Sequence, residues 1–133
     1  KPDVVVHFLK TVRQQAGDTV LKMILETGAM TQPDDIKQAA TLSIDAGVDF
    51  IKTSTGKIET GATLNAASIM LECIKTLNPK VGLKVSGGIK TPETAIQFYQ
   101  EAVTHLGEDW VATPDHFRIG ASTLYQALQR TVT

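Results

Sequence analysis

The sequence predicts an α/β fold in which four strand–helix units, preceded by one helix, build a single parallel sheet. Short apolar runs alternate with segments of helical periodicity along the chain. The runs recur about every 30 residues, which is the length of one strand–helix–strand unit. Such units pair their strands in parallel with right-handed crossovers. Because no low-complexity segment or linker interrupts the sequence, we interpret residues 1–133 as one structural unit.

The first half of the chain is expected to hold two helices and two strands. Residues 3–16 place apolar side chains at helical spacing. Residues 20–25 form a short apolar run that predicts the first strand. Pro33 suits the first turn of the next helix, which we expect to end at Gly47. The second strand is predicted over residues 48–52.

The second half repeats this pattern, with clear signals for the starts of two helices. Thr63 can cap the third helix, because its hydroxyl can accept a hydrogen bond from the first helical turn. Thr91 followed by Pro92 predicts a cap and a preorganised first turn for the next helix. The remaining elements are expected at residues 81–85 (strand), 116–119 (strand) and 122–131 (helix).

A sheet of four parallel strands has two exposed edges and, in this arrangement, one uncovered face. Exposed edges invite pairing with another chain. We therefore expect this unit to need a complement, which could be a second half, a swapped partner or a dimer mate.

Composition excludes several classes of function. The formal net charge is −1, with 13 basic and 14 acidic residues, so nucleic acid is not an expected partner. No apolar run reaches the ~18 residues of a membrane span, and no signal-peptide pattern opens the chain. A single cysteine, Cys73, excludes an intrachain disulfide framework and agrees with a reducing compartment. We expect a cytoplasmic protein.

Lys52 is the most informative residue of the sequence. It stands at the end of the second predicted strand, within the run DFIKTSTGK of residues 49–57. In parallel α/β architectures the C-terminal ends of strands carry the chemistry. A free lysine amine, with a pKa near 10.4, is about a thousandth neutral at physiological pH. Lys52 is therefore either a strand-end lysine that snorkels to water or an activated nucleophile.

Lys84 occupies a matching place in VGLKVSGG, one strand–helix unit later. We expect the two amines on neighbouring strands, where Lys84 would be the cation that favours the neutral form of Lys52 and assists proton transfer. Lys22, in the first strand, is a third candidate. Its sequence leaves open whether it faces inward, and a structural ion pair is as reasonable as a catalytic role.

Other familiar sites are not indicated. The three histidines lie far apart and outside metal-ligand spacing, so no metal site is expected. Ser122 has no histidine partner placed by sequence, which leaves a hydrolase triad unsupported. The histidines are His7, His105 and His116.

Three ordered motifs, DFIKTSTGK, VGLKVSGGIKT and FRIGAST, closely resemble the C-terminal half of deoxyribose-phosphate aldolases. The segments LKMILETG and AGVDFIKTSTGK also fit that family, and the resemblance covers nearly the whole chain. It implies the C-terminal half of a (β/α)8 TIM barrel. It also implies cleavage of 2-deoxy-D-ribose 5-phosphate to acetaldehyde and D-glyceraldehyde 3-phosphate through a lysine Schiff base. Lys52 would form the imine, Lys84 would be the second essential lysine, and no cofactor is implied.

The phosphate of such a substrate is expected at glycine-rich loops and helix starts. Backbone amides at helix N-termini bind anions, and glycine lets the backbone approach an oxyanion closely. TIM barrels often place phosphate at their last two βα loops. The residues expected there are Gly87, Gly88, Gly120, Ser122 and Thr123, and the resemblance adds Gly56 and Lys57. Thr123 stands where the family usually shows a serine, so a hydroxyl is kept.

Length raises a further expectation. A (β/α)8 barrel typically needs ~250 residues, so residues 1–133 are expected to be a fragment or one half of a barrel. The family relays protons through an aspartate of the N-terminal half, and no residue of this chain matches that motif. An alternative is therefore a non-catalytic half-barrel that assembles with a partner chain or binds phosphorylated ligands. The expected partners are a phosphorylated sugar and an N-terminal half-barrel, in the same or a separate chain, or a homo-oligomer mate.

Overall fold

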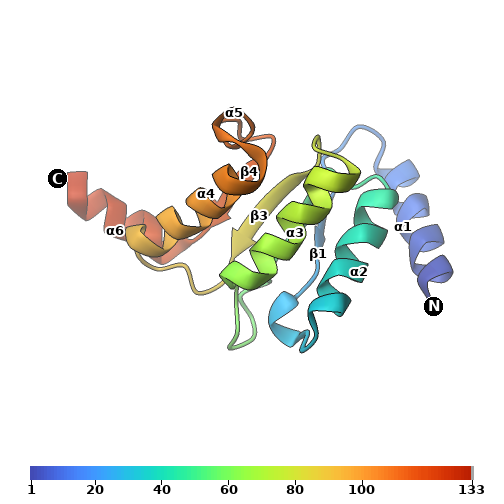
Figure 1. Ribbon diagram of the computed structural model, residues 1–133, viewed down its shortest axis with the longest axis horizontal. Helices are drawn as coiled ribbons and strands as arrows, with labels where there is room; N and C mark the ends of the chain where they lie inside the picture. The colour runs from blue at the N-terminus through green and yellow to red at the C-terminus, as the bar shows by residue number, and fades with distance from the viewer. Residues whose placement is uncertain (133) are drawn as a thin grey trace.

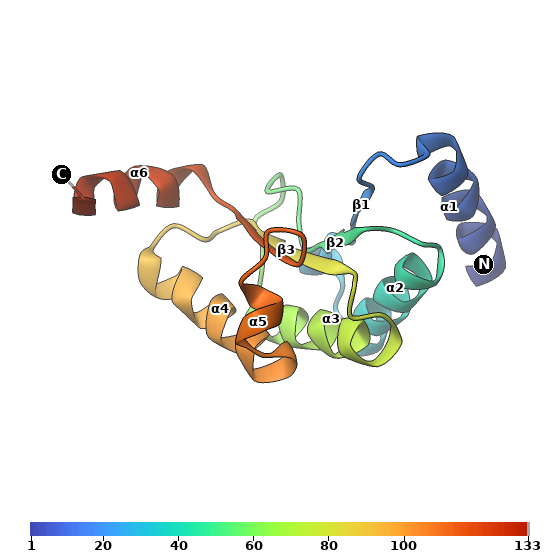
Figure 2. The same ribbon diagram turned by 90° about the horizontal axis from the view of Figure 1, so that it is seen from above.

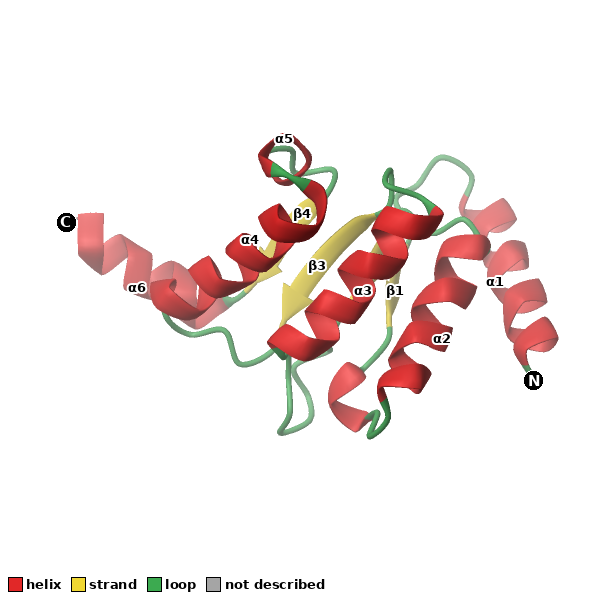
Figure 3. Ribbon diagram, viewed as in Figure 1, coloured by secondary structure: helices red, strands yellow, loops and turns green. Residues whose placement is uncertain are grey.

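The computed structural model describes residues 1–132 and contains one parallel sheet with the strand order β1-β2-β3-β4 (Figures 1 and 3). The strands are β1 (Lys22–Ile24), β2 (Phe50–Lys52), β3 (Gly82–Ser86) and β4 (Phe117–Gly120). The helices are α1 (Pro2–Ala16), η1 (Thr27–Ala29, a 3-10 turn), α2 (Pro33–Asp45), α3 (Leu64–Leu77), α4 (Pro92–Leu106), α5 (Glu108–Val111) and α6 (Ser122–Val132). This order confirms the predicted α/β fold.

Side-chain caps fix the starts of the two central helices. The Thr63 hydroxyl accepts a hydrogen bond from the amide of Ala66 and caps α3. The Thr91 hydroxyl accepts one from the amide of Thr94 at the start of α4. Each cap satisfies an amide that the helix itself cannot, worth ~1 kcal/mol. Both predicted caps are therefore confirmed.

The register of the strands separates the sheet into two chemically different faces. Ile51 pairs with Leu83, and Leu83 pairs with Phe117, so apolar side chains line one face. On the other face Lys52 pairs with Lys84. Because side chains alternate along a strand, every second residue belongs to the polar face.

Helices cover only the apolar face. Seen from above, α2, α3 and α4 lie together on one side of the sheet, while α1 and α6 lie at its two ends (Figure 2). The core fills the space between these helices and the sheet. Its fully buried large apolar side chains are Ile51, Met70, Leu71, Ile74, Leu83 and Val85. Each such side chain contributes ~1.5–3 kcal/mol by leaving water.

The two ends of the layer leave large apolar side chains in water. Phe8 on α1 is 64% exposed and Tyr125 on α6 is 63% exposed. The edge strands β1 and β4 lie at the same two ends. The expected features of an incomplete unit, namely free edges and an uncovered face, are thus present among the described residues.

The structure corrects some boundaries and adds two short helices. Strand β1 covers Lys22–Ile24 and not residues 20–25. Helix α2 ends at Asp45 with Ala46 as its C-cap, and Gly47, with a φ of 91°, stops the helix as expected. The 3-10 turn η1 and helix α5 were not predicted, because both are too short for a periodic signal. Trp110 holds α5 in place: its indole nitrogen donates to the carbonyl of Pro79 at 2.6 Å, and its ring stacks on His116.

Candidate active site

Lys52 and Lys84 are register partners on adjacent strands and belong to the uncovered face. Adjacent strands are about 4.8 Å apart, so the two side chains rise side by side. Lys52 is the last residue of β2, and only Val85 and Ser86 follow Lys84 in β3. Both amines are therefore near the C-terminal edge of the sheet, as the sequence predicts.

Two further cations share this face. Arg118 pairs with Lys84, and Lys22 pairs with Phe50. The Lys22 amine lies 5.5 Å from the centre of the Phe50 ring, and the Arg118 guanidinium lies 4.6 Å from it. Lys22 thus faces the same side as Lys52. None of the four cations forms an ion pair with a described carboxylate.

This environment acts on Lys84. Burial lowers the pKa of the Lys84 amine first, and the positive charges of Lys52, Lys22 and Arg118 lower it further. Both causes disfavour the ammonium form. Lys84 is therefore easier to deprotonate than a free lysine, which suits a group that exchanges protons.

A cavity of about 280 Å³ opens where the two lysines meet the loops that follow β2, β3 and β4. Its walls are Lys52, Thr55, Gly56, Lys84, Ser86, Gly87, Gly88, Ile89, Lys90, Gly120, Ala121, Ser122 and Thr123. The expected site residues therefore gather at one cavity, except Lys57. The exposed Lys57 lies outside the lining, and its amide donates to the Thr55 hydroxyl at 3.1 Å.

Glycines at this cavity are required by the backbone or by close packing. Gly87 and Gly88 have φ values of 93° and 78°, which residues other than glycine rarely adopt. A Cβ atom on Gly120 would lie 2.9 Å from Cε of Lys84. Gly120 therefore leaves room for the Lys84 side chain at the mouth of the cavity.

Buried hydroxyls join the loops beneath the two lysines. The Thr53 hydroxyl donates to the carbonyl of Ser86 at 2.9 Å and accepts from its amide at 3.0 Å. The Ser86 hydroxyl donates to the carbonyl of Ser54 at 2.6 Å. Thr53 and Ser54 are fully buried. These bonds fix the end of β3 against the residues that directly follow Lys52.

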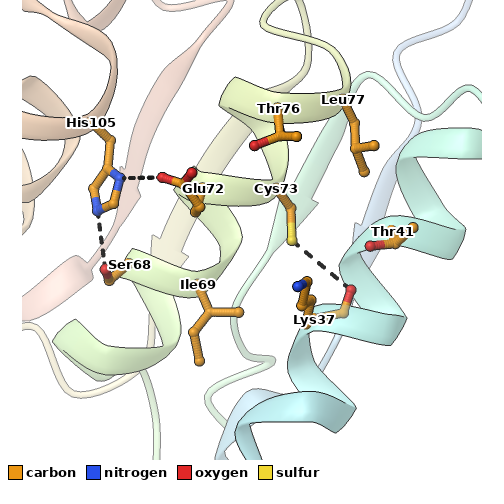
Figure 4. A pocket seen from close by; sticks show the side chains of 9 residues that line it. All are labelled: Lys37, Thr41, Ser68, Ile69, Glu72, Cys73, Thr76, Leu77 and His105. Atoms are coloured by element: carbon orange, nitrogen blue, oxygen red, sulfur yellow. Dashed lines mark hydrogen bonds and ion pairs between the residues drawn. The ribbon is translucent and has the colours of Figure 1, made fainter.

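A larger cavity, of about 460 Å³, lies in the outer helical layer (Figure 4). Cys73 lines it, and burial raises the pKa of its thiol, which disfavours the reactive thiolate. On its other side His105 contacts Ser68, Glu72 and Glu101 at 3.0–3.2 Å. This cavity lies on the helix side of the sheet, away from the two lysines, so we do not assign the chemistry to it.

Of the two remaining histidines, His7 is exposed and His116 has structural contacts. The His116 ring stacks on Trp110 with the ring centres 5.1 Å apart, and its Nδ1 donates to the carbonyl of Trp110 at 3.1 Å. Within residues 1–132 no group of three His, Cys, Asp or Glu residues could hold a metal ion. No helix in that range is long and apolar enough to cross a membrane.

The sequence interpretation missed several residues of the cavity and its surroundings. Ser86 and Lys90 line the cavity, and they flank the segment Gly87–Ile89 whose two glycines carry the stronger sequence signal. Arg118 could have been found by strand alternation, because it stands two residues before Gly120. Glu26, which contacts Thr55, had no local signal, since the contact joins loops 29 residues apart.

Comparison with known proteins gives the same architecture. The model of the family described as DeoC/LacD family aldolase matches residues 4–130. A solved aldolase called QR15 is 31% identical, with a TM-score of 0.72, over 98% of this chain and 53% of its own. A candidate deoxyribose-phosphate aldolase from Coccidioides immitis is 31% identical, with a TM-score of 0.76, over 96% of this chain and 45% of its own.

A more distant structure supports the fold. A candidate deoxyribose-phosphate aldolase from Toxoplasma gondii ME49 is 22% identical, with a TM-score of 0.87, over 97% of this chain and 52% of its own. The chain thus spans about half the length of these solved relatives. The parallel sheet with its single helical layer corresponds to half of a TIM-type barrel. The chain belongs to the DeoC/LacD family of aldolases.

Proposed function

We propose that the protein containing this chain is a class I aldolase that cleaves 2-deoxy-D-ribose 5-phosphate to acetaldehyde and D-glyceraldehyde 3-phosphate. The observation that carries the proposal is the pairing of Lys52 with Lys84 at a cavity whose other walls are glycine-rich loops. Family membership supports an aldolase, and one 31% identical relative is described as a candidate deoxyribose-phosphate aldolase.

Lys52 is the proposed nucleophile. Its neutral amine adds to the aldehyde carbon of the open-chain sugar, and loss of water gives an iminium ion. Removal of the proton from the C3 hydroxyl then breaks the C2–C3 bond and releases glyceraldehyde 3-phosphate. The electron pair of that bond moves into an enamine, which takes a proton at C2. Hydrolysis of the resulting iminium releases acetaldehyde and regenerates the amine.

Lys84 is the proposed proton carrier beside this amine. The lowered pKa of Lys84 allows it to accept and return a proton near the reacting atoms. The iminium nitrogen is itself the electron sink, so this chemistry requires neither a metal nor an organic cofactor.

The proposed phosphate site lies at the loops after β3 and β4, together with Gly56 of the loop after β2, which lines the same cavity. Gly87 and Gly88 expose backbone there, and Ser122 and Thr123 are the first two residues of helix α6. The first amides of a helix lack partners within it and bind anions. Lys90 adds a positive charge to the same cavity. A sugar phosphate held at this end would direct its aldehyde toward Lys52.

We further propose that the partner of the uncovered face is a half-barrel that brings carboxylates. Four cations on this face have no carboxylate among the described ion pairs. Like charges about 7 Å apart repel by ~2 kcal/mol at an effective dielectric near 20. Two copies of this chain set face to face would double the cations in one lumen. An acidic N-terminal half, from the same or a separate chain, fits this face better than a second copy.

The alternative function is a half-barrel that binds phosphorylated ligands without catalysis. One observation favours it for the chain acting alone: the cavity of the described residues includes no aspartate or glutamate. Without a carboxylate from another half, the proton transfers would depend on Lys84 alone.

An aldol cleavage assay tests the proposal. The protein carrying both barrel halves is incubated with 2-deoxyribose 5-phosphate, and acetaldehyde release is followed with a coupled reductase. We expect release by the parent protein and a loss of at least 1,000-fold in Lys52→Met. Release by Lys52→Met at the parent rate would remove Lys52 from the mechanism, and binding without any release would favour the alternative.

A further inference from the structure

Glu26 has an unusual backbone conformation at the end of β1. Its φ and ψ are 56° and 55°, and it is the one non-glycine residue with positive φ among the described residues. This left-handed conformation costs about 1 kcal/mol or more for a residue with a Cβ atom. The surrounding structure must therefore hold Glu26 in place.

Hydrogen bonds on both sides of Glu26 enforce the conformation. The amide of Leu25 donates to the carbonyl of Lys52 at 2.9 Å, and the amide of Thr27 donates to the carbonyl of Thr53 at 2.9 Å. The chain after β1 thus stays bonded to the chain after β2. Glu26 bulges between these two bonds, next to the residue proposed as nucleophile.

The bulge directs the Glu26 carboxylate to the turn that follows β2. The Thr55 hydroxyl donates to Oε2 of Glu26 at 2.5 Å, and the Thr55 amide lies 3.3 Å from both carboxylate oxygens. The same hydroxyl accepts from the amide of Lys57 at 3.1 Å. The Glu26 carboxylate therefore holds the Thr55 hydroxyl, and that hydroxyl in turn holds the Lys57 amide, which fixes the turn of residues 55–57. Hydrogen bonds to a charged acceptor are about twice as strong as neutral ones.

The turn held in this way forms part of the cavity. Thr55 and Gly56 line it together with Lys52 and Lys84, whereas Glu26 does not. The amides of Thr55 and Lys57 are occupied, and the amide of Gly56 has no partner within the described part of the chain. Gly56 also has a positive φ of 79°. The turn therefore offers one free amide at the cavity.

We propose that Glu26 is a positioning residue that aims the Gly56 amide at the phosphate group of the substrate. The inference rests on the proposed aldolase function. Glu26 accepts hydrogen bonds from the amide and the hydroxyl of Thr55. Its carboxylate does not line the cavity, so its negative charge does not face the phosphate. Loss of its carboxylate should free the turn and weaken phosphate recognition, while imine formation with a phosphate-free aldehyde should remain.

The test uses Glu26→Ala, Thr55→Val and the double variant in the protein carrying both barrel halves. Glu59→Ala is the matched control, because Glu59 is an exposed carboxylate of the same loop without a described hydrogen bond. Borohydride trapping is measured with acetaldehyde, with 2-deoxyribose and with 2-deoxyribose 5-phosphate. Amide hydrogen exchange of Lys57 reports on the turn directly and needs no catalysis.

In Glu26→Ala we expect faster exchange at Lys57 and a half-saturating concentration of 2-deoxyribose 5-phosphate that rises about tenfold, as for one lost charge-assisted hydrogen bond. Trapping with acetaldehyde and the half-saturation for 2-deoxyribose should change less than twofold. Thr55→Val should behave alike, and the double variant should be no worse than either single one.

Three outcomes would overturn the inference: unchanged exchange at Lys57, equal losses with all three aldehydes, or additive effects in the double variant. Failure of the proposed function looks different. In that case the parent protein itself would trap none of the aldehydes, and the phosphate role of Glu26 would fall with it. The exchange at Lys57 would still show whether Glu26 holds the turn.

Discussion

At the scale of single residues, Lys84 is the cation of the open face whose pKa is lowered. Burial and three neighbouring cations lower its pKa, so the ammonium is destabilised in the folded chain. In the unfolded chain its pKa is near 10.4. Between the folded and unfolded values the unfolded chain binds more protons, so stability rises with pH through that window. Below the pKa of Lys84 in the folded chain, the full cost of holding its ammonium on this face lowers the stability.

Lys84→Met should therefore stabilise the fold at pH 7 by about 1 kcal/mol, which is less than the repulsion of one like-charge pair because solvent at the open face screens part of it. The gain should shrink as pH rises toward 10.4 and vanish above it. Urea unfolding of the protein carrying both barrel halves at pH 7, 9 and 11 measures this, with the exposed Lys75→Met as control. A gain that is the same at every pH would mean that packing, and not charge, is the cause.

The same substitution should impair chemistry while it improves stability. Without the Lys84 amine, the group proposed to exchange protons beside Lys52 is lost, and trapping of acetaldehyde at pH 7 should fall about tenfold. Higher pH should restore part of the loss, whereas Lys52→Met should recover nothing. The pH profile of adduct formation is the measurement. If Lys84→Met keeps the parent profile, Lys84 has no influence on the Lys52 amine.

At the scale of elements, the site depends on how β2 and β3 end. Thr53 satisfies both the amide and the carbonyl of Ser86 with one buried hydroxyl. Thr53→Val keeps the shape but leaves both groups unsatisfied, which should cost ~2–3 kcal/mol of unfolding free energy. Thr53→Ser keeps the hydroxyl and should cost about 1 kcal/mol or less. Equal losses in the two variants by chemical denaturation would show that the methyl group matters and the hydroxyl does not.

The order of the elements could be predicted from the sequence because its signals are local. Capping threonines and apolar runs are read from neighbouring residues, and the pairing of Lys52 with Lys84 follows from parallel strands in matching contexts. The side of the sheet that Lys22 faces could not be predicted, because it follows from the pairing of Lys22 with Phe50. The role of Glu26 could not be predicted either, because it depends on a contact with Thr55 in another loop. Helix α5 depends on Trp110 reaching Pro79, which no local pattern shows.

At the scale of the whole molecule, one covered and one uncovered face make the described unit incomplete. Exposed Phe8 and Tyr125 mark its two ends, and unpaired cations mark its open face. We predict that the isolated chain lacks cooperative unfolding as a monomer and forms a 1:1 complex with a complementary half-barrel. Sedimentation velocity and thermal unfolding of the chain, alone and mixed, measure this. A monomer that unfolds cooperatively by itself would contradict the need for a partner.

The central claim is that Lys52 attacks the aldehyde. Reduction with borohydride in the presence of acetaldehyde, followed by peptide mapping, tests it most directly, because the reduced imine marks the attacking nitrogen permanently. We predict one N-ethyl group on Lys52, seen as a net gain of C2H4 on the peptide that contains this residue, and no label in Lys52→Met. A label on Lys84, or on any peptide without residue 52, would contradict it.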